Sequence, residues 1–228
     1  MTMKFAISEA SAFDALIDEF YRVWLRYHPD LSLHLGIEDY AGLLPAIDED
    51  DVGALLSWLE SFLVALEELD FASLDEDRQL DWQVACGAVQ TEHYEWLEHD
   101  WRRRDPGRFL PLPLIRQLSL RTDSASEHAL SELLHWLPEH LRHARTLLAQ
   151  VPELVSRLAL AAALEQVQIG ESFLRQLGTI PRQDRPPSFK SRHQRLCATA
   201  EEAVKSYRDF LSRELAPQAS GTTGVGEA

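Results

Sequence analysis

The sequence predicts an all-α protein, an irregular bundle of about seven helices with no sheet. Glycine and proline are scarce, at 10 and 11 of 228 residues, whereas leucine, alanine and glutamate are frequent. Apolar residues make up 45 % of the chain and mostly recur at intervals of three and four, which places side chains on one face of a helix. No segment alternates between apolar and polar residues as a half-buried strand does.

The first predicted helix spans residues 11–27, where the apolar side chains follow the helical period. Ser11 and Asp14 form a pattern close to a capping box at its start. A short helix over Asp30–Leu35 follows, and Gly36 is suited to close it because glycine adopts the left-handed conformation without strain. The next eleven residues are predicted to be a loop.

Two longer helices fill the rest of the first half. Asp48 is a suitable N-cap for a helix over Glu49–Leu69, whose acidic first turn suits the positive end of the helix dipole. We interpret that acidic run as helix capping, because it lacks the alternating ligands and central glycine of a calcium loop. Ser73 or Asp75 caps the next helix, predicted over Glu76–Trp101.

The second half is predicted to begin with a short helix within Phe109–Leu120. Asp123 or Ser124 then caps a segment in which Pro138 either starts a second helix or bends a continuous one. A long helix is expected over Glu153–Leu177, with Pro152 in its first turn.

A last helix is expected from about residue 188 to residue 215. The helices are predicted to form one domain over residues 1–215. Residues 216–228 hold few apolar side chains and are predicted to be a flexible C-terminal tail.

The charge of the chain limits the partners it can have. The formal net charge is −15, with −19 over residues 1–100 and +4 over residues 101–228. An acidic surface repels nucleic acid and anionic lipid, so neither is an expected partner. No apolar run has the length of a membrane span, and the N-terminus does not resemble a signal peptide. We therefore expect a cytoplasmic protein in which Cys86 and Cys197 are reduced thiols.

No catalytic, cofactor-binding or metal-ligating residue is predicted, and no cofactor is expected. The chain has no His-Glu-x-x-His motif, no nucleophile elbow and no phosphate-binding loop. His128, Glu132, His135 and Glu139 are spaced to share a helix face, but a di-iron bundle needs two Glu-x-x-His helices. We interpret these four residues as a polar, salt-bridged face.

Two further clusters of charged side chains have simple interpretations. His93 and His99 lie among glutamates and are expected to form a surface strip. Arginines 102, 103, 104 and 108 are interpreted as partners of nearby acidic residues, with binding of an anion as the alternative.

Five segments follow one another in a characteristic order. They are YHPDLSLHLGIEDYAGLLPAID (27–48), LDEDRQLDWQVACGAV (74–89), WRRRDPGRF (101–109), LLHWLPEHLRHARTLLAQVPELVSRLALAAA (133–163) and RDFLSRELAPQASGTTGVGEA (208–228). Together they resemble the bacterial family called domain of unknown function 885, over nearly the whole chain. Arg78 and Asp81 match that family's Arg-x-x-Asp pattern, whereas Phe109 stands where the family has tyrosine.

The resemblance implies an all-helical architecture similar to zinc peptidases of the gluzincin type. Members of the family are more than twice as long, and their His-Glu-x-x-His helix lies in the second half. This chain matches the N-terminal portion, so none of the family's metal-binding or general-base residues has a matching position. The resemblance implies a truncated or split product, or a stand-alone derivative, that is catalytically incomplete on its own.

Three hypotheses follow. In the first, the chain is the non-catalytic part of a zinc-peptidase-like protein, a wall of the substrate channel, with an exposed apolar face for the missing C-terminal catalytic half. The alternative is a stand-alone helical binding module that can self-associate as a dimer. A metal-dependent helical enzyme using His128, Glu132 and His135 ranks last.

Overall fold

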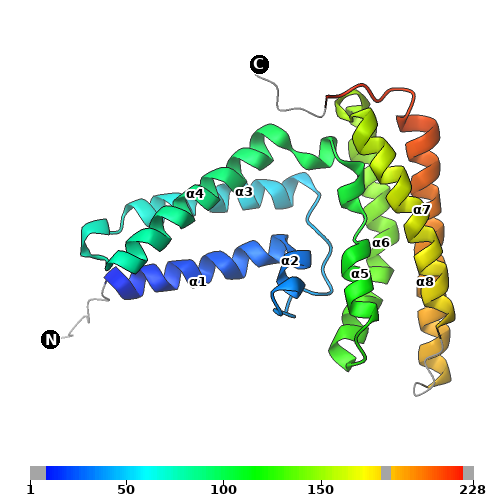
Figure 1. The fold of residues 1–228 in the computed structure, drawn as a ribbon, viewed down its shortest axis with the longest axis horizontal. Helices are drawn as coiled ribbons and strands as arrows, with labels where there is room; N and C mark the ends of the chain where they lie inside the picture. The colour runs from blue at the N-terminus through cyan, green and yellow to red at the C-terminus, as the bar shows by residue number, and fades with distance from the viewer. Residues whose placement is uncertain (1–8, 181–185, 223–228) are drawn as a thin grey trace. The chain divides into compact units, whose positions relative to one another are not determined.

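The computed structural model of the chain describes residues 9–180 and 186–222. Within these residues the protein is all-α, as predicted, with eight α-helices, short 3₁₀ turns and a single isolated β-bridge (Figure 1). The helices are α1 (Glu9–Tyr27), α2 (Pro29–His34), α3 (Glu49–Glu67), α4 (Glu76–His99), α5 (Leu112–Ser119), α6 (Ser124–Gln150), α7 (Arg157–Thr179) and α8 (Pro187–Phe210).

The helices divide into two compact units. Unit 1 contains α1, α3 and α4 and consists of the chain up to Tyr27 together with Asp48–Asp100. Unit 2 contains α2 and α5–α8 and consists of His28–Ile47 together with the chain from Trp101 onward. The chain therefore passes between the units three times. A single domain over residues 1–215 stays a prediction.

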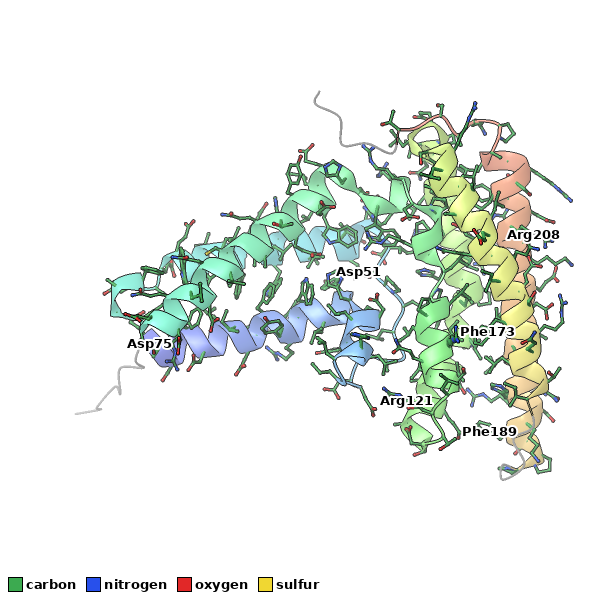
Figure 2. All side chains as sticks on the ribbon, in the orientation of Figure 1. Asp51, Asp75, Arg121, Phe173, Phe189 and Arg208 are labelled. Carbon is green, nitrogen blue, oxygen red and sulfur yellow. The ribbon has the colours of Figure 1, made fainter. Side chains whose placement is uncertain are left out.

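Local capping positions the hairpin of unit 1. The side chain of Asp48 accepts a hydrogen bond from the Asp51 N–H at 2.8 Å, and Asp75 accepts one from the Arg78 N–H at 3.0 Å. Both residues are N-caps, which confirms Asp48 and selects Asp75 over Ser73. The helices α3 and α4 that they start lie antiparallel (Figures 1 and 2).

Aromatic side chains and one carboxylate join α1 to this hairpin. The ring centroid of Phe20 on α1 lies 5.8 Å from that of Trp58 and 5.1 Å from that of Phe62, both on α3. Glu92 on α4 accepts hydrogen bonds from the Trp96 indole at 2.6 Å and from the Trp24 indole of α1 at 3.3 Å. The two indole donors satisfy a half-buried carboxylate, so α1 and α4 are linked by a polar contact inside an apolar cluster.

Unit 2 has one continuous apolar core to which α5, α6, α7 and α8 all contribute. Helix α6 is continuous through Pro138, which decides between the two predicted alternatives. Proline removes a backbone donor from a helix, but Leu137 and Leu141 beside it are buried and keep α6 packed. At the end of α5, Arg121 donates to Glu38 at 2.5 Å, which joins α5 to the loop after α2 (Figure 2).

Two predicted helix starts are wrong. Helix α1 is already formed at Glu9, so Ser11 and Asp14 lie inside it, and the Asp14 carboxylate pairs with Arg78 at 2.8 Å. Helix α7 begins at Arg157, because Ser156 acts as N-cap and accepts from the Ala159 N–H at 3.1 Å. The residues from Pro152 form only a short 3₁₀ turn before it.

The predicted tail begins too early. Ala219 is only 3 % exposed, and the Gly221 N–H donates to the Val155 carbonyl at 3.0 Å. A Cβ atom at Gly221 would overlap the Leu154 backbone, so this close approach requires glycine. Residues 216–221 are therefore packed onto unit 2, and the rest of the predicted tail, residues 223–228, lies outside the described residues.

A buried arginine joins the two segments of unit 2. Arg102 is 2 % exposed, and its Nη1 donates to the Ile47 carbonyl at 2.9 Å. Ile47 is the last residue before the chain enters Asp48–Asp100, and Arg102 is the second residue after it returns. This hydrogen bond thus closes the base of the excursion that contains α3 and α4.

We expect Arg102→Met to lower the free energy of unfolding by about 1.5–3 kcal/mol, the usual contribution of a hydrogen bond to a charged group. Methionine keeps the apolar stem and removes the donors. Arg104→Met is the matched control, because Arg104 is exposed, and we expect a change below about 0.5 kcal/mol. Urea unfolding followed by circular dichroism measures both, and equal effects would contradict the assigned role.

Candidate functional site

The histidine face of α6 is polar and open to solvent. His128, His135 and Glu139 are exposed and Glu132 is half-buried. Glu139 forms an ion pair with Arg142, one turn further along the helix. Among the described residues, no three His, Cys, Asp or Glu side chains lie together where they could hold a metal ion. His128, Glu132, His135 and Glu139 are therefore not brought together with other ligands as a metal site in this part of the chain.

The cysteines and the remaining predicted histidines occupy separate environments. Burial, aided by the charge of Glu67, raises the pKa of the half-buried Cys86 thiol. The Cys197 Sγ lies 3.6 Å from Nε2 of His193, but both side chains are buried and closed to a dissolved substrate. His93 and His99 are both half-buried, and Nε2 of His93 lies 3.2 Å from a carboxylate oxygen of Glu60 on α3. Neither cysteine is placed as an accessible nucleophile.

The predicted arginine cluster is dispersed. Arg102 is buried against the Ile47 carbonyl, and the guanidinium of Arg108 lies 4.7 Å from the centre of the Trp101 ring. Arg102 and Arg108 thus have structural contacts within unit 2. A common anion site for all four, the alternative in the sequence analysis, does not form.

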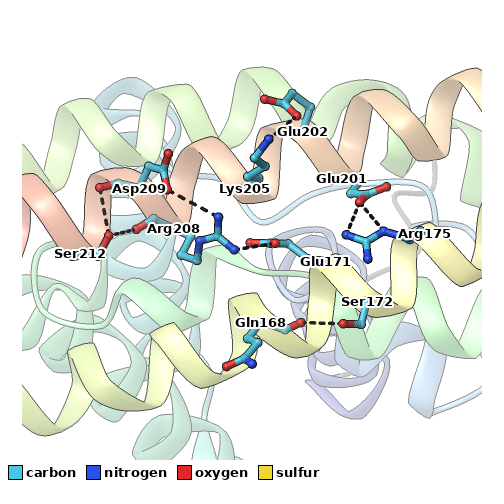
Figure 3. A network of polar contacts seen from close by, with 10 residues as sticks. All are labelled: Gln168, Glu171, Ser172, Arg175, Glu201, Glu202, Lys205, Arg208, Asp209 and Ser212. Atoms are coloured by element: carbon cyan, nitrogen blue, oxygen red, sulfur yellow. Dashed lines mark hydrogen bonds and ion pairs between the residues drawn. The ribbon is translucent and has the colours of Figure 1, made fainter.

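A buried ion pair that the sequence analysis missed holds α7 against α8. Glu171 on α7 is buried and accepts from Arg208 on α8 at 2.7 Å (Figure 3). Its second oxygen, Oε1, is buried without a hydrogen-bond partner among the described residues. Arg175 and Glu201 form a second, more exposed pair at 2.8 Å. The signal in the sequence was an acidic residue on the apolar face of α7.

His140 is the second buried polar group that sequence reasoning missed. Burial lowers its pKa to about 4, although a hydrogen bond to the Phe109 backbone opposes the shift. Its Nε2 atom is buried with no hydrogen-bond partner among the described residues. The ring is therefore neutral at physiological pH and packs against the edge of Phe109 in the core.

Helix α4 carries several exposed apolar side chains. Leu80, Val84 and Tyr94 are 61, 63 and 55 % exposed. With Gly87 and Thr91 they are spaced alternately four and three residues apart, which places all five on one face of the helix. We call these five residues the α4 seam, and it is the candidate functional site.

The α4 seam lies opposite the face that α4 buries in unit 1. The buried or half-buried face carries Trp82, Val89 and Trp96, which recur every seven residues. The Thr91 hydroxyl donates to the Gly87 carbonyl at 2.8 Å, so this polar group of the seam is satisfied within the helix. The seam is thus an apolar strip on the exposed side of a helix that is already anchored.

Gly87 is an unexpected residue in the middle of a 24-residue helix. Glycine in a helix interior costs about 0.5–1 kcal/mol relative to alanine. A Cβ atom at Gly87 would meet nothing within 4 Å, so packing inside the chain does not require glycine here. Its effect on the seam is to leave a shallow point where another backbone can approach closely.

No family model matches the chain, and no curated protein matches it. One solved structure shares the fold. It is a protein from Shewanella oneidensis described as "a putative lipoprotein of unknown function", with a TM-score of 0.75 and 14 % sequence identity. The similarity covers 93 % of this chain but only 38 % of that longer chain. At this identity the match establishes a shared helical fold.

The described helices also bear on membrane insertion. Among them, none is both long enough and apolar enough to cross a membrane.

We expect Arg208→Met to destabilise the protein by about 1–2 kcal/mol. The variant leaves the buried Glu171 carboxylate without its partner, although partial exposure of Arg208 lets water offset part of the loss. Lys205→Met is the matched control on the same helix, because its pair with Glu202 is exposed, and its effect should be near zero. Chemical denaturation compares the two, and a Lys205 effect as large would refute the argument.

His140 should make stability depend on pH. The unfolded chain binds a proton near pH 6.5 and the folded chain only near 4, so stability falls as the pH decreases through this window. We expect His140→Gln to remove a slope of up to about 1.4 kcal/mol per pH unit. Urea midpoints from pH 7 to pH 4 measure it, with His135→Gln as the exposed control. Parallel pH profiles for wild type and His140→Gln would contradict the prediction.

Proposed function

We propose that this chain is the non-catalytic part of a zinc-metallopeptidase-like architecture and acts by docking to a separate catalytic part. The observation that carries the proposal is the relation of lengths: the fold covers 93 % of this chain and 38 % of its longer structural neighbour. A fold that makes up a minor part of a larger chain is suited to work as one wall of a composite protein.

The resemblance to the family called domain of unknown function 885 supports the same assignment. Its first segment, residues 27–48, nearly coincides with the His28–Ile47 stretch of unit 2, and its third segment starts where the chain returns to unit 2. These segments meet at the Arg102–Ile47 hydrogen bond. The chain itself lacks a donor set for zinc in its described parts, so catalysis is assigned to the partner.

A stand-alone helical binding module is the second candidate. The exposed α4 seam favours it, because a solvent-facing apolar strip serves equally well as a dimer interface or as a surface for another protein. In that case the longer neighbour shares ancestry of the fold alone, and no catalytic partner is needed.

We retain the cytoplasm as the proposed location. The structural neighbour is described as a lipoprotein, so the location has its own test. Cell fractionation followed by detection of the native chain should place it with cytoplasmic markers, and recovery with the membrane fraction would overturn the proposal.

The proposed function predicts peptidase activity only when this chain is combined with a separate catalytic protein. Reading frames near the gene are searched for a helical protein with His-Glu-x-x-His, and its product is produced together with this chain. We expect a 1:1 complex with zinc-dependent peptide hydrolysis that neither component has alone. Exchange of the motif's Glu for Gln should abolish hydrolysis and leave the complex intact.

Two results would overturn the proposal. The first is stoichiometric zinc and peptide hydrolysis by this chain in isolation. The second is the absence of any such neighbouring protein together with reversible dimerisation in sedimentation, which would establish the binding-module alternative.

A further inference from the structure

We propose that the α4 seam is a docking site for a single helix of a partner protein, whose apolar face is flanked by lysine or arginine. The inference deepens the proposed function by naming the surface and the chemistry of the partner. It is carried by three properties of α4: the spacing of the seam, its depth at Gly87 and the unpaired charges beside it.

The spacing of the seam selects a helix as the occupant. Leu80, Val84, Gly87, Thr91 and Tyr94 alternate four and three residues apart, the repeat by which two helices pack as a coiled coil. The seam spans fifteen residues, from Leu80 to Tyr94, or about 21 Å along the helix. A strand or an irregular loop would not match a repeat of 3.5 residues over this length.

Gly87 indicates how the partner helix approaches. It is exposed, and a Cβ atom there would meet no other atom within 4 Å. Between the larger side chains of Val84 and Tyr94, it leaves a depression into which a large side chain of the partner can insert. The seam therefore offers both knobs and a hole, as two packed helices require.

The charges beside the seam select a basic partner. Asp77, Asp81 and Glu95 lie along one side of it, and all three are exposed. None of the three has an ion-pair partner within the described parts of the chain. In coiled coils the positions next to the seam carry the charges that choose the partner, so lysine or arginine on the incoming helix is the complement.

The same charges argue against a second copy of this chain. Unit 1 has four Lys and Arg against twenty Asp and Glu, a net charge of −16. Self-association through α4 would bring two such units together and would be opposed by their repulsion. A basic helix from another polypeptide meets the opposite field.

The test uses two synthetic 21-residue helical peptides. One carries Leu at every a and d position and Lys at every e and g position, which prevents it from pairing with itself; the other carries Glu in place of Lys. Fluorescence anisotropy measures the binding of each to the full chain at 50 mM and 500 mM NaCl. We expect the Lys peptide to bind at least tenfold more tightly than the Glu peptide, with an affinity that falls at high salt.

Variants distinguish docking on the seam from general attraction to an acidic protein. The double variant Leu80→Gln, Val84→Gln leaves the net charge unchanged and should weaken binding of the Lys peptide at least tenfold. Leu158→Gln, Ile169→Gln is the matched control, because both residues are equally exposed on α7 and it should leave binding unchanged. Gly87→Leu fills the depression and should also weaken binding, with an unchanged circular dichroism spectrum.

Three outcomes would overturn the proposal: no binding of the Lys peptide, equal affinity for both peptides, or equal loss in the α4 and α7 variants. A dimer in sedimentation equilibrium that Leu80→Gln, Val84→Gln dissociates would assign the seam to a second copy instead. The peptide assay requires no catalytic partner. Failure to reconstitute a peptidase would thus refute the proposed function without affecting the proposed docking surface. Failure of the Lys peptide to bind would refute the docking surface without affecting the proposed function.

Discussion

The hydrogen bond from buried Arg102 to the Ile47 carbonyl is the constraint on which the path of the chain depends. It joins the residue where the chain leaves unit 2 to the place where it returns, so the whole of α3 and α4 is an excursion with a fixed base. A buried carbonyl that lacks a hydrogen-bond donor raises the free energy of the folded state. The Arg102 donor therefore favours this path of the chain over one that leaves the Ile47 carbonyl unpaired. The α3–α4 hairpin completes its core with α1, which comes from an earlier stretch of the chain.

The helices of units 1 and 2 are held together by different contacts. Unit 2 has a continuous apolar core shared by α5–α8, whereas in unit 1 aromatic rings and Glu92, which accepts from two indoles, join α1 to the α3–α4 hairpin. Helix α4 faces inward through Trp82, Val89 and Trp96 and still carries the apolar α4 seam on the opposite side. The net negative charge of unit 1 opposes association of two exposed seams, and it favours the approach of a positively charged helix.

The buried titratable groups of the described chain serve packing. Glu171 is paired with Arg208, and burial keeps His140 neutral. Cys197 lies beside His193, and both are buried residues of α8. Groups held this way stabilise helix contacts and are closed to a substrate.

By itself, the sequence determined the helical class and most helix ends. Asp48, Asp75 and Asp123 are N-caps, and Gly36 has the positive φ of 80° that a C-terminal cap requires. These features are local, since each cap and the N–H it satisfies are two or three residues apart. Only the tertiary structure decided the packing of residues 216–221, the burial of Arg102 and the exposure of the α4 seam. Each of these depends on contacts between distant segments, and an apolar repeat along a helix looks the same whether a neighbour covers it or solvent does.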